Sequence, residues 1–138
     1  MVDDLKVAKR EIRTMNMNQV TLPALNLADS VSFYRKLGLL QIVDSKDYAR
    51  FECPDGDATF SIHVADESEV GVGAATYFEH EDLDALCEHL KDEGLEFSQM
   101  PRDESWLWRE AWLDDPSGNA ICLYWAGENR KNPPGRVD

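Results

Sequence analysis

Histidine, cysteine and basic residues are scarce in this sequence. Its 138 residues include three histidines and three cysteines, and 14 lysines and arginines stand against 27 aspartates and glutamates. The cysteines, Cys53, Cys87 and Cys122, form an odd number and lack the paired spacing of zinc sites. The formal net charge of −13 disfavours nucleic acid and membrane surfaces as partners, because both carry negative charge and repel a polyanion.

Long apolar runs are also missing. No stretch approaches the roughly 20 apolar residues that a bilayer-spanning helix needs, and the N-terminal residues lack the apolar centre of a signal peptide. We therefore expect a cytoplasmic protein with reduced thiols. Hydrophobic residues make up 43% of the chain, which is sufficient for the core of one compact domain.

The sequence contains two related stretches, each a tight turn followed by a strand. Residues 115–125 read Asp-Pro-Ser-Gly-Asn-Ala-Ile-Cys-Leu-Tyr-Trp, and residues 53–63 read Cys-Pro-Asp-Gly-Asp-Ala-Thr-Phe-Ser-Ile-His. Proline and glycine favour the turn, and the alternation that follows gives each strand one apolar face and one face free to line a cavity. Allowing one inserted residue, Ser61 matches Cys122 and His63 matches Tyr124. The chain is therefore predicted to contain two modules of similar size.

Each module is expected to contain a strand, a helix and three further strands. We predict strands over residues 18–23, 39–43, 48–53 and 59–64, and then over 74–78, 95–97, 107–113 and 120–125. The first helix is expected to start at an N-cap of Asp29 or Ser30 and to stop at Gly38; the second covers residues 82–92 and stops at Gly94. Alternation places Tyr48 and Arg50 on the same strand face.

The predicted domain occupies residues 17–126. It contains module one (17–64), a linker (65–73) and module two (74–126). Residues 1–16 are charged and weakly patterned, so we interpret them as an N-terminal extension. Residues 127–138 form a C-terminal tail with two adjacent prolines, which we expect to be an extended strap or a disordered end.

The order of these motifs resembles the vicinal oxygen chelate superfamily, which includes glyoxalase I, bleomycin-resistance proteins and extradiol dioxygenases. The resemblance is carried by residues 19–34 (Gln-Val-Thr-Leu-Pro-Ala-Leu-Asn-Leu-Ala-Asp-Ser-Val-Ser-Phe-Tyr), by Leu37-Gly38-Leu39 and by residues 115–123. It covers roughly residues 17–126. It implies an α+β fold in which two βαβββ modules form an incomplete barrel around a cleft, within a homodimer.

Metal-dependent members of this family hold their ion on the first and last strands of each module. The matching positions in this sequence are Gln19, Ser61, Ala75 and Cys122. Of these, Gln19 alone is an ordinary ligand of the family, since alanine has no donor and serine is a poor ligand. We therefore predict no cofactor. A divalent metal in a shifted site of Gln19, His63 and Glu110, beside Cys122, is the alternative.

Three side chains on the predicted cleft carry alternative interpretations. His63 has the titration range of a general acid or base, or it is held by a neighbouring hydroxyl or backbone group. Arg50 is suited to bind an acidic group of a ligand, or it pairs with Glu110 of the other module. Cys122 is a nucleophile if His63 or Arg50 lowers its pKa; otherwise it is a small apolar filler.

The resulting hypothesis is a protein that binds a small organic ligand in a cleft with a degenerate metal site, similar to the antibiotic-sequestering members of the family. The predicted ligand-binding residues are Gln19, Tyr48, Arg50, Ser61, His63, Trp108, Glu110, Trp112, Cys122 and Tyr124. Trp106 and Trp125 are expected in the core or in dimer contacts. The alternatives are a metal-dependent lyase or dioxygenase with a rearranged ligand set, and a metal-free enzyme with His63 or Cys122 as catalytic residues.

Overall fold

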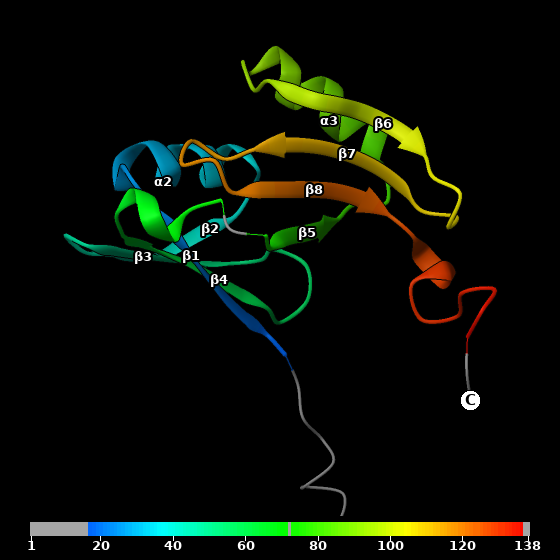
Figure 1. Ribbon diagram of the computed structural model, residues 1–138, viewed down its shortest axis with the longest axis horizontal. Helices are drawn as coiled ribbons and strands as arrows, with labels where there is room; N and C mark the ends of the chain where they lie inside the picture. The colour runs from blue at the N-terminus through cyan, green and yellow to red at the C-terminus, as the bar shows by residue number, and fades with distance from the viewer. Residues whose placement is uncertain (1–16, 72, 137–138) are drawn as a thin grey trace, which may run out of the picture.

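Two four-stranded sheets, one in each module, form the frame of the protein (Figure 1). The computed structural model describes residues 17–71 and 73–136. Sheet A has the order β1-β4-β3-β2, with β1 (Gln19–Ala24), β2 (Leu40–Asp44), β3 (Tyr48–Glu52) and β4 (Thr59–Val64). Sheet B has the order β5-β8-β7-β6, with β5 (Ala75–Glu79), β6 (Phe97–Asp103), β7 (Arg109–Asp114) and β8 (Ala120–Trp125).

One helix follows the first strand of each sheet: α2 (Leu27–Lys36) follows β1 and α3 (Leu83–Asp92) follows β5. The first and last strands of each module pair in parallel, and the other neighbours pair antiparallel. The predicted α+β fold of two βαβββ modules is therefore confirmed, and the two sheets do not close into a barrel. Neither α2 nor α3, nor any other helix within the described residues, has the length and apolar character that a membrane crossing requires.

The strand registers show the internal repeat directly. In sheet A, Arg50 of β3 pairs with Ser61 of β4, and in sheet B, Trp112 of β7 pairs with Cys122 of β8. Two residues further along these strands, the pairs are Tyr48 with His63 and Glu110 with Tyr124. The match between the two turn-and-strand stretches, including the inserted residue, is thus reproduced in the pairing of the strands.

The larger of the two apolar clusters of the described residues joins the two modules. Phe60 of β4 is buried, and its ring lies 4.5 Å from that of Tyr34 on α2 and 5.7 Å from that of Phe78 on β5, measured between centroids. The buried part of this core extends from sheet A and α2 to the side chains of α3 and sheet B, including Leu83, Leu90, Leu113, Ile121 and Leu123. The helix-facing sides of both sheets are therefore used for stability, and the opposite sides are left for other interactions.

The turn before β8 fastens module two to module one. The buried carboxylate of Asp115 accepts a hydrogen bond from the Tyr34 hydroxyl (2.6 Å) and others from the backbone N–H groups of Ser117 and Asn119 (2.9 Å each). The Asn119 side chain donates to the Pro23 carbonyl at 2.8 Å. Every buried polar group needs such a partner, so this turn is a structural junction as well as a chain reversal.

Three elements have a boundary that differs from the sequence prediction by more than one residue. The N-cap of α2 is Asn26, whose Oδ1 accepts the Asp29 N–H at 3.0 Å, rather than Asp29 or Ser30. Strand β6 begins at Phe97, not residue 95, and continues through Pro101, which an edge strand tolerates. Strand β7 begins at Arg109 rather than residue 107.

The predicted N-terminal extension, residues 1–16, lies outside the described residues. The linker contains a short 3-10 helix, η1 (Glu67–Glu69). After β8 the chain forms a second one, η2 (Gly127–Asn129), at the start of the region predicted as the C-terminal tail. The Glu79 carboxylate accepts the backbone N–H groups of Ala126 and Gly127, both at 3.0 Å, which holds this turn against β5.

Candidate functional site

The predicted site residues lie on the sides of the sheets that face away from the helices, in two separate groups. We call the group on sheet A the polar face: Gln19, Tyr48, Arg50, Ser61 and His63. On sheet B and in the loop before β7, the predicted residues Trp108, Glu110, Trp112, Cys122 and Tyr124 form a second group together with Tyr77 and Trp106, and we call these seven residues the aromatic face. Within the described chain no hydrogen bond, ion pair or ring contact joins one face to the other.

A chain of hydrogen bonds runs across the polar face. Ser61 is fully buried, and its Oγ accepts from Gln19 Nε2 at 2.8 Å and lies 2.6 Å from the Tyr48 hydroxyl. The Nε of Arg50 donates to the same hydroxyl at 2.9 Å. The hydrogen bonds from Ser61 and Arg50 lower the pKa of Tyr48, because both favour the phenolate. The face therefore presents a phenol that ionises more readily than an ordinary tyrosine.

His63 lies beside Tyr48 on the neighbouring strand. Its Nδ1 is 3.1 Å from the carbonyl oxygen of Val64, which is a contact with the backbone rather than with another site residue. The ring is partly exposed. The structure thus places His63 on the polar face, with Nε2 free of any hydrogen bond among the described residues.

Four rings of the aromatic face touch one another. Trp108 stacks on Tyr124, with centroids 4.7 Å apart and planes at 17°. Tyr77 stands nearly perpendicular to Trp108, Trp112 and Tyr124, at 84°, 80° and 82°, with centroid distances of 6.1, 5.6 and 5.6 Å. Such edge-to-face packing is the favoured arrangement of aromatic pairs, and it gives the face the form of a corner.

Glu110 is buried beside these rings, with 3% of its surface exposed. Its two carboxylate oxygens accept hydrogen bonds from two indoles, from Trp106 Nε1 at 2.7 Å and from Trp112 Nε1 at 3.0 Å. The predicted ion pair between Arg50 and Glu110 is wrong: Arg50 bonds to Tyr48, and no salt bridge of the described residues includes Glu110. The two modules hold these residues on different sheets.

Cys122 is fully buried beneath the aromatic face. Burial, and then the nearby Glu110 carboxylate, raise the pKa of its thiol to about 12. A thiolate is the reactive form of cysteine, so this environment disfavours a nucleophile at neutral pH and suits a small packed side chain. Neither His63 nor Arg50 contributes to the pKa of this thiol.

Two residues of the aromatic face were not selected from the sequence. Trp106 was expected in the core or a dimer contact, yet it is 52% exposed and donates to Glu110 from the loop before β7. Tyr77 was placed on a strand without a role; its position between Ala75 and Glu79 would have predicted its outward face by alternation. Trp125 is 40% exposed on the helix side of sheet B, so it is not a core residue either.

The donors present do not fit a divalent metal within one chain. Among residues 17–71 and 73–136, no three His, Cys, Asp or Glu side chains come close enough to share an ion. Both polar atoms of the Gln19 amide are engaged by hydroxyl groups, those of Ser61, Thr21 and Thr59. Glu110, the third member of the shifted set, is held by indoles on the other sheet. The described residues of one chain therefore do not assemble the shifted site.

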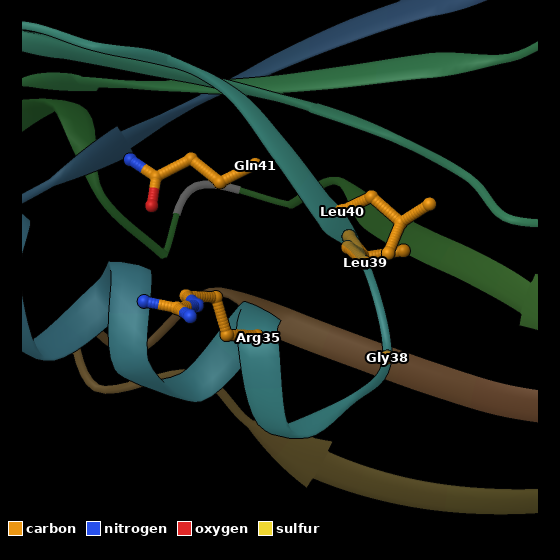
Figure 2. Close-up of a pocket in the computed structure, with 5 residues that line it drawn as sticks. All are labelled: Arg35, Gly38, Leu39, Leu40 and Gln41. Carbon is orange, nitrogen blue, oxygen red and sulfur yellow. The ribbon is translucent and has the colours of Figure 1, made fainter.

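Two surface hollows of the described chain border α2, away from both faces. The first is lined by Arg35, Gly38, Leu39, Leu40 and Gln41, and Figure 2 shows it between the end of α2 and the start of β2. The second is lined by Ala28, Val31, Ser32, Arg35 and Lys36. Neither includes a predicted ligand-binding residue, so the hollows do not mark the predicted cleft.

Comparison with known proteins agrees with the observed fold and also assigns the chain to a protein family. The sequence profile of the Glyoxalase/Bleomycin resistance protein/Dioxygenase superfamily matches residues 16–123. No curated protein matches the chain. A glyoxalase/bleomycin resistance protein/dioxygenase from Nocardioides has a similar crystal structure, with 21% identity, a TM-score of 0.70, and coverage of 99% of this chain and 100% of that one.

Two further solved structures illustrate the range of similar proteins. A bleomycin-binding protein complexed with bleomycin is 17% identical over 81% of this chain and 98% of its own, with a TM-score of 0.65. A lactoylglutathione lyase from Agrobacterium tumefaciens is 17% identical over 80% of this chain and 92% of its own, with a TM-score of 0.66. At these identities the likeness shows a shared fold, which hosts both a binding protein and an enzyme.

Proposed function

Because this chain belongs to the glyoxalase/bleomycin resistance protein/dioxygenase superfamily, we propose that it binds a small organic ligand on the aromatic face without a metal ion. The observation that carries this proposal is an uncovered set of large rings: Tyr77 is 45% exposed and Trp106 is 52% exposed. Ligand sites are commonly lined by aromatic side chains with a few polar groups among them, and Glu110 supplies such a group on this face. Of the four positions at which metal-dependent members hold their ion, Gln19 keeps an ordinary ligand, and Ser61, Ala75 and Cys122 replace the other three.

The proposed cleft is shared between two copies of the chain. In one copy the aromatic face and the polar face do not meet, and both are open to solvent at their edges, as the exposed Arg50 and Tyr77 show. In a symmetric dimer, the polar face of each copy would cover the aromatic face of the other. The dimer would therefore contain two equivalent clefts, each able to enclose one ligand. The homodimer expected from the sequence is therefore part of the proposal.

The proposal also places the protein in a reducing compartment such as the cytoplasm. Its three cysteines are all free, and Cys87 and Cys122 are buried. Structural disulfides are rare where thiols are kept reduced, and these side chains are compatible with that environment.

A thermal-shift screen of planar organic molecules, followed by calorimetric titration of the hits, tests the binding proposal. We expect at least one hit whose affinity falls by about tenfold or more in Trp108→Leu, because ring contacts of this size contribute on the order of 1 kcal/mol or more. Trp125→Leu is the matched control, since it removes an indole from the opposite side of sheet B. A hit that is lost equally in both variants, or no hit at all, would contradict the proposal.

The metal-dependent alternative is tested by elemental analysis of the purified protein and by titration with Zn²⁺, Ni²⁺, Mn²⁺ and, without oxygen, Fe²⁺. We expect no stoichiometric metal. A bound ion that disappears in Gln19→Ala or His63→Ala would replace the proposal with a lyase or dioxygenase that has a rearranged ligand set. Sedimentation velocity tests the dimer, and a monomer at micromolar concentration would remove the shared cleft.

A second candidate, a metal-free reaction on the polar face, is favoured by one observation. The Tyr48 hydroxyl is surrounded by hydrogen bonds that lower its pKa, and proton transfer is most effective when the pKa of the catalyst approaches the working pH. His63 on the adjacent strand adds an imidazole next to Tyr48. Turnover of any ligand from the screen, lost in Tyr48→Phe or His63→Gln while binding persists, would favour this function over simple binding.

A further inference from the structure

The chemical class of the ligand follows from the charge and the rings on the aromatic face. Building on the proposed function, we propose that the aromatic face selects a planar organic cation, such as an aromatic quaternary ammonium compound. Three features support this ligand class: a buried carboxylate without a cationic partner, the rings around it, and the pairing of the neighbouring acids with arginines.

Glu110 is the only acid of the aromatic face that no described basic residue neutralises. Two other acids border the face, and each has its own arginine: Glu104 lies 3.1 Å from Arg102, and Glu79 lies 3.9 Å from Arg130. Glu110 accepts hydrogen bonds from two indole N–H groups, and no salt bridge of the described residues includes it. Removing a carboxylate from water without a countercharge is costly, so a cation that arrives with the ligand would relieve an existing cost.

The two indoles transmit this charge to the surface. Trp106 and Trp112 each donate an N–H to Glu110, and hydrogen bonds to an anion polarise the donor groups. The negative faces of the rings are thereby strengthened, and a cation over the face of tryptophan is the strongest form of cation–π contact. An exposed indole and a buried carboxylate thus act on the same ligand.

The ring geometry favours a flat cation over a point charge. Trp108 and Tyr124 form a parallel stack, and Tyr77 stands at about a right angle to it. The flat face and the edge of a planar molecule can each contact one of the two perpendicular walls of this corner. A hydrated ammonium ion is nearly spherical and gains nothing from that arrangement. The formal net charge of −13 adds a long-range attraction for any cation.

The polar face provides an internal contrast. Its charged group is the Arg50 guanidinium, which is bonded to the neutral Tyr48 hydroxyl and forms no salt bridge among the described residues. An anionic ligand would therefore be attracted to sheet A, and a cationic one to sheet B. The sign of the ligand charge distinguishes the two faces.

Isothermal titration of the full chain with three matched naphthalene-sized probes tests this proposal. The probes are N-methylquinolinium, whose charge does not titrate, neutral 1-naphthalenemethanol, and anionic 1-naphthoate. We expect N-methylquinolinium to bind about tenfold or more tighter than either of the others, a difference that corresponds to about 1.4 kcal/mol. The preference should shrink as salt is raised, because salt screens the long-range attraction between the net negative charge of the protein and the cation.

Two single-charge variants make the test specific. Glu110→Gln should remove the preference for the cation, whereas Glu104→Gln, which removes the same charge from an acid already paired with Arg102, should keep it. Thermal unfolding of each variant identifies a folding defect. If Glu110→Gln does not fold, the comparison of the three probes on the unmodified chain still decides the question.

Each other outcome overturns the inference in a different way. Equal affinity for the cationic and the neutral probe would leave ligand binding intact and remove its charge selectivity. Tighter binding of 1-naphthoate would indicate that the ligand site lies at Arg50 on the polar face of sheet A. If none of the three probes binds, the cation proposal fails, and the thermal-shift screen separately decides whether the protein binds small molecules at all.

Discussion

The two modules follow one plan on the side that faces the core and differ in most side chains on the other side. Matched positions facing the helices are buried and apolar in both copies: Ala49 and Ala111, Phe51 and Leu113, Phe60 and Ile121, Ile62 and Leu123. Matched positions facing outward differ in charge or polarity in three of four pairs: Tyr48 and Glu110, Arg50 and Trp112, and His63 and Tyr124, whereas Ser61 and Cys122 are both small and buried. Packing limits the first set, because a core loses stability when volumes change, while the second set is free to specialise.

The largest effect is expected at the junction turn, whose buried carboxylate has no counterpart in the corresponding turn of module one. Asp115→Ala would leave the Tyr34 hydroxyl and the backbone N–H groups of Ser117 and Asn119 buried without their acceptor. The free energy of unfolding should fall by about 3 kcal/mol or more, since each unsatisfied buried group costs roughly 1–3 kcal/mol. Urea denaturation followed by circular dichroism measures this.

Asp55→Ala is the control, because Asp55 is exposed in the corresponding turn of module one. Its effect should stay within about 0.5 kcal/mol, as for most surface substitutions. Equal decreases in the free energy of unfolding in the two variants would show that both turns stabilise the protein to the same extent. The two modules would then be more alike than their contacts indicate.

The three thiols should differ in their rates of chemical labelling, because their surroundings differ. Cys87 and Cys122 are buried and have their pKa raised to about 12 by burial, while Cys53 is partly exposed. At pH 7 we expect a disulfide reagent to label Cys53 first and the other two on the order of 100-fold more slowly, because labelling of a buried thiol requires opening of the structure. Cys53→Ser removes the fast phase, and rapid labelling of Cys122 would restore it as a candidate nucleophile.

Alkaline pH should destabilise the core side of module one through Tyr34. Burial, and then the Asp115 carboxylate, raise its pKa, so the folded state favours the neutral phenol. This stabilisation is fully present below the unfolded pKa of about 10 and is lost above it, by at most about 1.4 kcal/mol for each pH unit. Tyr34→Phe should give a shallower fall of stability with pH than the unmodified chain. Identical slopes would contradict the assignment.

The smallest effect distinguishes Tyr48 from the other tyrosines. Its pKa is lowered, whereas burial raises the pKa of Tyr34, Tyr77 and Tyr124. An ultraviolet titration of the folded protein should therefore show the first phenolate at Tyr48, and this step should be absent in Tyr48→Phe. Ser61→Ala removes one of the two hydrogen bonds and should move the step to higher pH. A first step that survives Tyr48→Phe would show that the polar face does not perturb this residue.

Features of the sequence that depend on local rules were predictable. Alternation placed Tyr48 and Arg50 on one strand face, and Gly38 and Gly94 ended both helices with φ values of 101° and 97°, which glycine adopts readily. The N-cap at Asn26 was missed because several residues near it have capping side chains, and Ser30 is instead buried near Ser117 of the other module. N-cap propensity alone does not decide which of several neighbouring capping residues starts the helix.

The site was predictable as a set of outward positions but not as a geometry. The pairing of Arg50 with Glu110 assumed that the two outward faces meet within one chain, and this depends on how the modules are oriented through Phe60 and Phe78. Trp106 lies in a loop, where no periodicity indicates the direction of a side chain. Its bond to Glu110 forms because a buried carboxylate needs donors.

The junction around Asp115 also determines when the protein can fold during its synthesis. Tyr34 is separated from Asp115 by 81 residues, and Pro23 from Asn119 by 96. The N-terminal half therefore leaves the ribosome long before its partners are made. Contacts of such sequence separation slow folding and leave apolar surface exposed in the meantime. Although the chain is a repeat, its first half is expected to remain incomplete until the turn after β7 has emerged.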